Sequence, residues 1–397
     1  MAKPKLGLIP AAQGTKLYSV LPSDGTGDFT FTRGSVATRI NAQGLIENVA
    51  SGQSRLDYPM IDGVQKGCPH HILEPARTNL FSYSEDFNSG SPNWVLYGGA
   101  TVTSNNAISP DGTLNADKLS NQGGIYSQRV YNPNIDYVFS LFIKKNTATG
   151  LHMNFVDQSS GYLGGTIIYT YSSGAIQITQ SANSSVSAKS VDYGNGWIRL
   201  IMKFTTNVAQ NYNYQAIESI GGDSLIWGAM LEQGSYPTSY IPTNGQSGGV
   251  TRSAETANGA GNSTTFNSEE GVLMAEISAL ADDLTFRTIL LSDGTNSNRI
   301  GMFYRTQSNV VELFYYNSTL TYFHRTTLND IKTSNKIALI YKNQDFKVFV
   351  NGIKQDEQLS GSTSLFTLND LSFSGIGSEP FYGNVKQLQY FNSALDS

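Results

Sequence analysis

Short runs of alternating or continuous apolar residues, separated by clusters of Gly, Asn, Ser and Thr, extend along most of this chain. In residues 137–145, YVFSLFIKK, both alternating faces are largely apolar, which is typical of a central strand buried on two sides. Residues 345–352 alternate apolar and polar side chains and end in Asn351 and Gly352, a pair that predicts a hairpin turn. Helical periodicity is nearly absent, and even SEEGVLMAEISALADD at 268–283 favours a strand. The pattern predicts an all-β protein.

The spacing of these runs divides the chain into four segments. Residues 1–75 are turn-rich and poor in apolar runs, so we expect a connector or attachment region that packs on a neighbour; an ordinary N-terminal subdomain is the alternative. Residues 76–252 carry repeated strand patterns that predict a sandwich of antiparallel sheets. Residues 253–264 are rich in Gly, Ser, Thr and Asn and predict a flexible linker. Residues 265–397 repeat the strand pattern and predict a second sandwich or jelly roll.

The composition points to a β-protein whose surface is polar but weakly charged. Of 397 residues, 14% are charged, against roughly 25% in ordinary soluble domains. Gly (39), Tyr (22) and Phe (19) are abundant, and these residues suit turns and half-buried strands. Such a surface fits extracellular or virion β-proteins and the recognition of carbohydrate by hydroxyl and amide groups. A plain soluble β-protein remains the equal alternative on composition alone.

Charge, cysteine content and hydropathy exclude several classes of protein. The net charge of −5 offers no basic stripe for nucleic acid. The single Cys68 excludes an intrachain disulfide framework and a cysteine-based zinc site. The start of the chain, MAKPKLGLIP, lacks the apolar core of a signal peptide, and no run approaches the roughly 18 apolar residues of a membrane helix. We expect synthesis in a cytoplasm, no membrane insertion, and arrival outside as part of a larger particle.

The sequence shows no catalytic motif, so we predict that the chain is not an enzyme. None of the four histidines lies in HExxH or beside a GxSxG elbow. His70 and His71 are adjacent, so in a strand they point to opposite faces and do not bind one metal simply. Glycosidases need two carboxylates that meet in space, and carboxylate pairs of that kind stay hidden in a sequence. A polysaccharide-degrading enzyme therefore stays open as an alternative.

Saccharide binding needs an aromatic face for the apolar side of a sugar ring, with amides and carboxylates for its hydroxyls. Trp197 and Trp227 lie inside apolar strands, so we expect them in the core. Trp94 lies in the loop-like NSGSPNWVLYGG and is expected to be more exposed. The candidate ligand contacts are aromatic residues in turn-rich or alternating segments: Trp94, Tyr97, Tyr126 and Tyr162 in the second segment, and Tyr304, Tyr315, Tyr316, Tyr322 and Tyr382 in the last.

A long motif near the N-terminus resembles a module common in phage tail-fibre, spike and head-fibre proteins. Its hallmark is FTR-x-S-x-ATR-x-N-x-x-G-LIE, then R-x-DY, then LEP-x-RTNL. The resemblance implies a virion component that carries variable binding or lytic domains after the module. The matching residues are Phe31, Thr32, Arg33, Ser35, Ala37, Thr38, Arg39, Asn41, Gly44, Leu45, Ile46, Glu47, Arg55, Asp57, Tyr58, Leu73, Glu74, Pro75, Arg77, Thr78, Asn79 and Leu80.

The two later segments also resemble known families. NLFSYSEDFNSGSPNW, YVFSLFIKK, GNGWIRLIMKF and IWGAMLEQGSYPTSYIPT, within 79–243, are similar to carbohydrate-binding-module-like β-sandwiches. FKVFVNGIK and GNVKQLQYFNSAL resemble strands of concanavalin-A-like (laminin-G-type) jelly rolls. The sandwich resemblance also implies a structural Ca²⁺ with oxygen ligands such as Glu85, Asp86 and Asp117; no other cofactor is expected.

These observations lead to one principal hypothesis and two alternatives. The leading hypothesis is a phage spike or fibre subunit, exposed on the virion, that binds a host-surface glycan for attachment. The resemblance implies a homotrimer anchored to other virion proteins through its N-terminal region. The alternatives are a depolymerase spike of the same architecture and a purely structural decoration protein. Tail or capsid-vertex location, and the identity of host and glycan, stay open.

Overall fold

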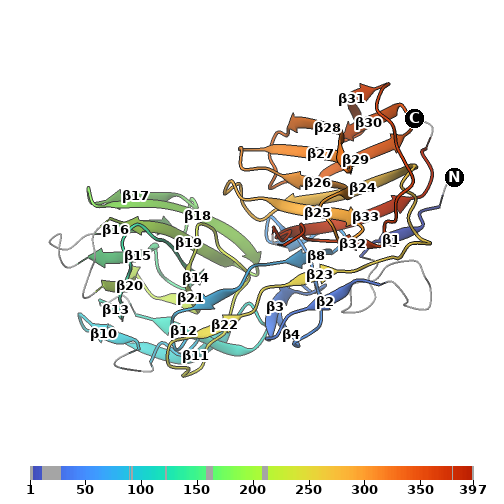
Figure 1. Ribbon diagram of the computed structural model, residues 1–397. Helices are drawn as coiled ribbons and strands as arrows, with labels where there is room; N and C mark the ends of the chain where they lie inside the picture. Colours follow the sequence, from blue (N-terminus) through green and yellow to red (C-terminus); the bar gives the residue numbers. More distant parts are fainter. Residues whose placement is uncertain are drawn as a thin grey trace.

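The computed structural model describes residues 3–10, 28–88, 90, 93–120, 123–157, 164–207, 213–377 and 379–395. Two β-sandwiches lie side by side, joined by a band of short strands (Figure 1). The described residues contain no helix, and therefore none that is long and apolar enough to cross a membrane. The prediction of an all-β fold built on antiparallel sandwiches is confirmed.

The middle sandwich packs two six-stranded antiparallel sheets face to face. One sheet has the order β10 (Val95–Tyr97), β13 (Gly124–Arg129), β20 (Asn213–Ile220), β15 (Gly150–Asp157), β16 (Gly165–Thr170) and β17 (Ile176–Gln180). The other has the order β11 (Val102–Ile108), β12 (Leu114–Leu119), β21 (Ser224–Gln233), β14 (Asp136–Lys145), β19 (Trp197–Thr206) and β18 (Ser184–Gly194). The predicted central strand is β14, which pairs with β19 and β21 and has seven buried residues, 137–143, of which only Ser140 is not hydrophobic. Trp197 and Trp227 are buried as expected.

The C-terminal sandwich packs a five-stranded sheet on an eight-stranded sheet. The five-stranded sheet has the order β28 (Thr319–Thr327), β27 (Val310–Asn317), β26 (Asn298–Tyr304), β25 (Arg287–Ser292) and β32 (Asp370–Ser372). The eight-stranded sheet runs β31 (Ile353–Gln358), β30 (Asp345–Val350), β29 (Asn335–Lys342), β24 (Glu270–Ala279), β33 (Gly383–Phe391), β8 (His70–Leu73) and β5 (Arg55–Asp57), with β1 (Leu6–Leu8) also on β33. The predicted hairpin is β30–β31, with Asn351 and Gly352 at positive φ of 51° and 81°.

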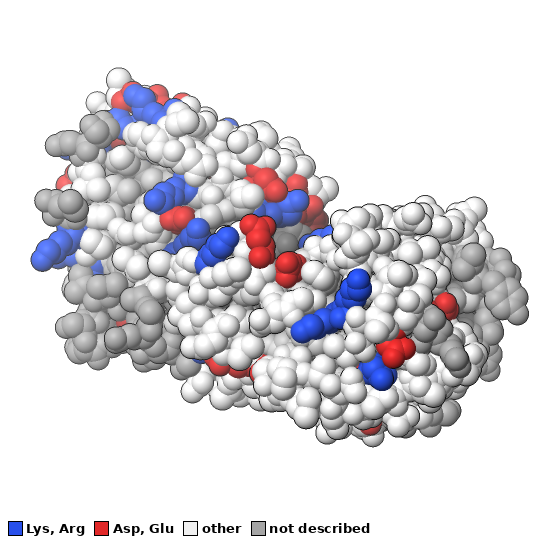
Figure 2. Space-filling model, turned by 180° about the vertical axis from the view of Figure 1, so that it is seen from behind, with Lys and Arg blue, Asp and Glu red and all other residues white. Residues whose placement is uncertain are grey.

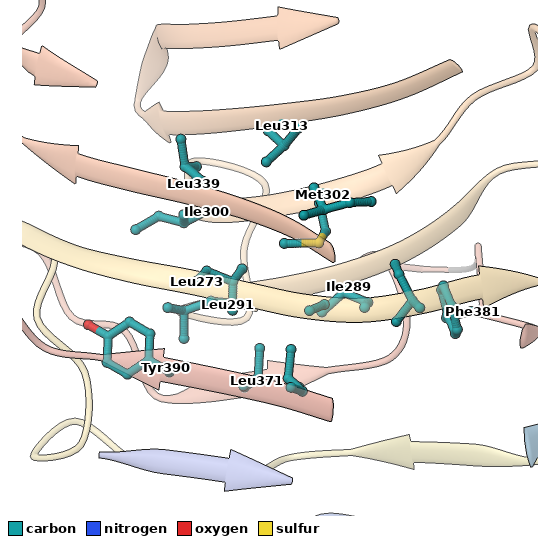
Figure 3. Packing of buried hydrophobic residues seen from close by; sticks show 14 of the residues in the cluster. Leu273, Ile289, Leu291, Ile300, Met302, Leu313, Leu339, Leu371, Phe381 and Tyr390 are labelled. Carbon is teal, nitrogen blue, oxygen red and sulfur yellow. The ribbon is translucent and has the colours of Figure 1, made fainter. Parts of the chain in front are cut away.

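The core of this sandwich is a layer of apolar side chains contributed by both sheets (Figure 3). Leu273 of β24 and Leu339 of β29 lie on one side, and Ile289 of β25 and Ile300 of β26 lie on the other. All four are fully buried. Alternation along each strand places every second residue in this layer, which is why the period-2 pattern predicted the strands.

The N-terminal residues are part of the C-terminal sandwich. Strands β1, β5 and β8 all belong to its eight-stranded sheet, and β1 pairs with the last strand, β33. The sequence predicts a region at 1–75 that packs on a neighbour. In this chain that neighbour is residues 265–397, which explains why the N-terminal region has few apolar residues of its own. The boundaries of the four segments stay predictions.

Segment 253–264, expected to be a flexible linker, is packed in the structure. It contains β23 (Thr256–Asn258), which pairs with β2 (Thr30–Thr32). Ala257 and Ala260 are fully buried. The small side chains of this segment allow it to pack closely against its neighbours, so its Gly- and Ala-rich composition does not mark a flexible linker.

The remaining short strand pairs are β9 (Arg77–Asn79) with β22 (Val250–Arg252), β3 (Ala37–Ile40) with β4 (Ile46–Val49), and β6 (Met60–Ile61) with β7 (Val64–Gln65).

A buried network of charged side chains lies at the junction of the two sandwiches. Its members, named here the junction network, come from the N-terminal motif and from the segment after the middle sandwich: Arg33, Arg55, Glu74, Arg252 and Glu255. Arg55 Nε donates to Glu255 Oε1 (2.8 Å), and its Nη2 donates to Glu74 Oε2 (2.8 Å). Arg33 Nη1 also donates to Glu255 Oε1 (2.7 Å). Arg252 pairs with Glu74 at 2.9 Å. All five side chains are at most 2% exposed.

The network gives three charged residues of the N-terminal motif a structural role. Burial alone would raise the pKa of Glu74, but Arg252 and Arg55 lower it to about 2. Glu74 is therefore ionised at neutral pH and matches the two arginines. Buried charges are tolerated when each is paired and hydrogen-bonded. The motif residues Arg33, Arg55 and Glu74 thus hold segments together that are about 200 positions apart in the sequence.

Two buried histidines on β8 predict loss of stability in acid. Burial, followed by the charge of Lys386, lowers the pKa of His70 from 6.5 to about 4. Burial, followed by His70, lowers the pKa of His71 to about 3. At these two histidines the unfolded chain therefore binds more protons than the folded chain as the pH falls below 6.5. The two neutral histidines therefore contribute stability that is present above pH 6.5 and is lost as the pH falls towards their folded-state pKa values of about 4 and 3. Asp57 opposes the trend, because burial raises its pKa from 3.8 to about 6 and its contribution is lost as the pH rises.

We expect the urea midpoint of the protein to be lower at pH 4.5 than at pH 7. His71→Leu should weaken this pH dependence, because the variant removes a group that charges only in the unfolded chain in that range. His324→Gln, at a partly exposed histidine, is the matched control. Equal pH dependence in the wild type and His71→Leu would show that His71 does not titrate as described.

Candidate functional site

Aromatic, amide and ionisable side chains gather on the outer face of the sheet that contains β13, β15 and β20. We name this set the tyrosine face: Tyr97, Tyr126, His152, Asn154 and Glu218. Strand pairing brings them together, since Tyr126 is opposite Ala216 and Ala216 is opposite Asn154. In the next row Tyr97 is opposite Gly124, which is opposite Glu218, and Glu218 is opposite His152. A pocket of about 280 Å³ opens here, lined by Tyr97, Tyr126, Asn154, Val156, Ala216 and Glu218.

Alternation along the strands creates this face. On β15, Leu151, Met153 and Phe155 point into the core and are fully buried. The residues between them, His152 and Asn154, therefore point to the other side of the sheet. Strands β13, β20 and β15 are each paired with a strand on both sides, so the sheet and the core beneath it hold this face in place.

Glu218 is the centre of the hydrogen-bond network on this face. The Tyr97 hydroxyl donates to Glu218 Oε1, and Asn154 Nδ2 donates to the same oxygen at 3.3 Å. His152 Nδ1 lies 3.3 Å from Glu218 Oε2. The hydrogen bond from His152, and then that from Tyr97, hold the pKa of Glu218 below its usual range, although burial acts the other way. Burial, and then the hydrogen bond to Glu218, raise the pKa of Tyr97. At neutral pH Glu218 is a carboxylate and Tyr97 a neutral phenol.

The arrangement offers both kinds of contact that a sugar needs. The rings of Tyr97 and Tyr126 are neighbours, with centroids 5.8 Å apart and planes tilted by 50°. Their half-buried faces supply apolar surface next to a pocket. Asn154 is 8% exposed, and its Oδ1 is buried without a hydrogen-bond partner among the described residues. A buried acceptor left unpaired is costly, and a hydroxyl group of a ligand would satisfy it.

Gly124 makes room for the contact between Tyr97 and Glu218. A Cβ at this position would lie 2.5 Å from the carbonyl oxygen of Ile217, 2.6 Å from Glu218 Cγ and 2.9 Å from the Tyr97 hydroxyl. We expect Gly124→Ala to destabilise the fold by about 1–3 kcal/mol, as overpacking does, and to weaken ligand binding by displacing Glu218. Thermal unfolding and binding titrations would measure both effects. Gly34→Ala is the control, since its Cβ would meet only Ser253 Oγ, at 3.5 Å; equal behaviour of the two variants would contradict this account.

Several of the predicted ligand contacts are core residues. Trp94 is 1% exposed, packs on Phe81 and Phe87, and donates its indole N–H to the carbonyl oxygen of Tyr83. It is therefore not the exposed loop residue that the sequence predicts, because two phenylalanines cover it. The same correction applies to three tyrosines of the C-terminal sandwich that are at most 1% exposed: Tyr304, Tyr315 and Tyr322.

The other predicted residues lie apart from one another. Tyr97 and Tyr126 share the tyrosine face. Tyr316 is half-buried on β27, with the guanidinium of Arg299 over its ring. Tyr382 is half-buried at the junction, beside Arg77 and Phe286 in another pocket. Tyr162 lies outside the described residues.

Sequence reasoning missed three members of the tyrosine face: His152, Asn154 and Glu218. The alternation in LHMNFV, residues 151–156, was a usable signal, because it places His152 and Asn154 on the face opposite the apolar residues. The pairing of β15 with β20 that brings Glu218 beside them joins residues 66 positions apart. No local pattern carries that information.

Two of the three residues named for a structural Ca²⁺, Asp117 and Glu85, have both carboxylate oxygens engaged in hydrogen bonds. Both oxygens of Asp117 accept backbone N–H groups, from Phe87 and Asn105. Both oxygens of Glu85 are also engaged, one by the Tyr240 hydroxyl and one by the Asn115 amide. The structural Ca²⁺ stays a prediction. Within the described ranges no group of three or more His, Cys, Asp or Glu side chains could hold a metal ion.

The surface around the sandwiches carries few charges. In the view from behind, neutral residues cover most of both lobes, and the charged side chains stand in small separate groups (Figure 2). This agrees with a charged fraction of 14%. A ligand on such a surface is recognised by hydrogen bonds and apolar contact more than by long-range attraction.

No protein-family model and no curated protein matches the chain. Among solved structures, it is similar to the CBM40 of Ruminococcus gnavus IT-sialidase bound to alpha2,3 sialyllactose, with 16% identity and a TM-score of 0.30 over 35% of this chain and 89% of that one. It is also similar to domains LG4-5 of the mouse laminin alpha1 chain, with 11% identity and a TM-score of 0.26 over 86% of this chain and 96% of that one. The LG1-3 region of the laminin alpha2 chain gives 13% identity and a TM-score of 0.21 over 84% and 65%. Scores this low do not place the chain in either family.

Proposed function

We propose that this chain is a glycan-binding protein of a phage virion, and that the tyrosine face binds a saccharide of the host surface. The observation that carries the binding part is the preformed cluster of Tyr97, Tyr126, Asn154 and Glu218 around one pocket. Paired aromatic rings supply the apolar platform. The carboxylate and the unpaired amide oxygen supply acceptors for hydroxyl groups.

The virion part of the proposal rests on the N-terminal motif and its resemblance to phage fibre and spike modules. In this proposal the particle displays several copies, as a homotrimer attached through residues 1–75, and weak saccharide contacts add up through avidity. Native mass measurement tests the trimer. A monomer at micromolar concentration would count against a spike.

Binding without hydrolysis fits the tyrosine face better than catalysis. Glycosidases of the usual kind use a pair of carboxylates on either side of the scissile bond. Glu218 is the single carboxylate among the described residues that line the pocket. We therefore propose that the saccharide is bound and released intact.

The experiment is a glycan array of bacterial surface polysaccharides, probed with the purified chain, followed by a reducing-sugar assay on each polysaccharide that binds. The proposal expects binding to one or a few structures and no release of reducing ends. Release of oligosaccharides would favour the depolymerase alternative. Absence of binding to any array member and to host cells would favour a purely structural protein.

A further inference from the structure

The five-stranded sheet of the C-terminal sandwich carries a second surface with recognition chemistry. Its outer face, named here the arginine face, holds arginines and aromatic rings in adjacent rows of β26, β27 and β28. Arg299 is opposite Tyr316, Phe314 is opposite Phe323, and Glu312 is opposite Arg325. The members of the arginine face are Arg299, Glu312, Phe314, Tyr316, Phe323 and Arg325.

Arginine guanidinium groups lie over aromatic rings on this face. The Arg299 guanidinium carbon lies 5.4 Å from the ring centre of Phe314 and 5.2 Å from that of Tyr316. Arg325 is similarly 5.5 Å from the ring of Phe323. Cation–π contact of this kind fixes the orientation of the guanidinium. A Cβ at Gly301 would lie 2.9 Å from Phe314 Cζ, so this glycine lets the ring lie close to the sheet.

The charges on the arginine face are not balanced. Glu312 pairs with both Arg305 (2.7 Å) and Arg325. Arg299 has no carboxylate partner among the described residues; its Nη1 donates to Asn296 Oδ1 at 3.1 Å, and its Nε is buried without a partner. The acids near that end of the sheet, Asp293 and Asp370, accept hydrogen bonds from other groups. The guanidinium of Arg299 is therefore available for an external anion.

Exposed apolar surface adjoins this cation. Phe323 is 47% exposed and Leu320 is 50% exposed, both on β28. Large apolar side chains exposed beside fixed charges mark a binding surface more often than scattered single residues do. A flat platform of rings suits the face of a sugar ring, and a planar guanidinium suits a carboxylate, which it can bind through two parallel hydrogen bonds.

We infer that the arginine face is a second saccharide site, specific for an acidic glycan whose carboxylate binds Arg299 and whose sugar ring lies on Tyr316 and Phe323. Its chemistry differs from that of the tyrosine face, where Glu218 repels an acidic sugar. The two faces belong to different sandwiches, so each binds independently of the other.

The test uses the full chain and oligogalacturonate, a carboxylate-bearing probe, with an uncharged dextran oligomer beside it. Arg299→Gln is expected to weaken oligogalacturonate binding about tenfold or more, the usual loss for a hydrogen bond to a charged group. Tyr316→Leu should weaken it several-fold. Lys342→Gln, which removes the same charge from β29 on the opposite sheet, should leave it unchanged. The dextran oligomer should not compete with oligogalacturonate for binding to the chain.

Three results would overturn the inference. The first is an absence of oligogalacturonate binding by the wild type. The second is an equal loss in Arg299→Gln and Lys342→Gln, which would indicate unspecific charge attraction. The third is an oligomer that dissociates in Phe323→Ser, which would show that a second copy covers this face. Tyr97→Ala is expected to leave oligogalacturonate binding unchanged. The binding proposed for the tyrosine face and the binding proposed for the arginine face can therefore fail separately.

Discussion

Glu255→Gln is expected to lower the free energy of unfolding by about 3–5 kcal/mol, because it removes one charge from a buried, fully paired network. Glu255 is 0% exposed and accepts hydrogen bonds from Arg33 and Arg55. A neutral amide in its place would leave three arginines and one carboxylate: Arg55 and Arg252 would share Glu74, and Arg33 would lose its carboxylate partner in the network. The side chains are at most 2% exposed, so bulk solvent screens the remaining charges only weakly. The loss is large relative to the usual stability of a domain.

Urea unfolding followed by two signals would measure the effect. All three tryptophans, Trp94, Trp197 and Trp227, lie in the middle sandwich, so tryptophan fluorescence follows that lobe while far-ultraviolet circular dichroism follows both. We expect coincident transitions in the wild type and a lower midpoint in Glu255→Gln. Glu357→Gln, at a surface residue whose side chain is 33% exposed and paired with lysines, is the control and should leave the midpoint unchanged. A midpoint in Glu255→Gln equal to that of the control would show that the network does not hold the sandwiches together.

Tyr97→Ala is expected to weaken glycan binding roughly 30-fold or more, the loss typical of an aromatic hot spot. The substitution removes one ring of the platform and the hydroxyl that orients Glu218. Tyr97 is on a short edge strand at the surface of the sheet, so the fold should persist. Tyr97→Phe keeps the ring and loses the hydroxyl, and about a fivefold loss is expected from one hydrogen bond.

Binding titrations with the strongest array ligand would compare these variants. Ile108→Ala is the matched control, because Ile108 is a 54% exposed apolar residue on the other sheet of the same sandwich. The order of affinity should be wild type and Ile108→Ala, then Tyr97→Phe, then Tyr97→Ala. An unchanged affinity in Tyr97→Ala would show that the tyrosine face does not bind the glycan.

The strands and turns of this protein could be predicted from its sequence because their signals are local. Residues 137–145 and the Asn351–Gly352 turn each carry the whole pattern within a few positions. The place of the N-terminal region could not be predicted, because β1, β5 and β8 complete a sheet whose other strands are about 200 or more residues away. The described residues of 1–75 do not form a core of their own. They pack on residues 265–397 of the same chain.

The candidate site was predicted only in part, for a related reason. Tyr97 and Tyr126 were found by residue type, and strand pairing places them together. Trp94 has the same residue type and a loop-like setting, yet long-range packing on Phe81 buries it. Glu218 accepts the hydrogen bonds of Tyr97 and Asn154 on this face, but no local sequence pattern distinguishes it from other acidic residues. Residue type identifies candidates, and only the pairing of strands decides which of them meet.

A crystal structure of the chain with its strongest array ligand would test the central claim most directly. The account predicts a sugar ring against Tyr97 and Tyr126, within about 4 Å of their rings, with hydroxyl groups on Glu218 and on Asn154 Oδ1. A saccharide bound elsewhere, with both tyrosines free, would contradict the account.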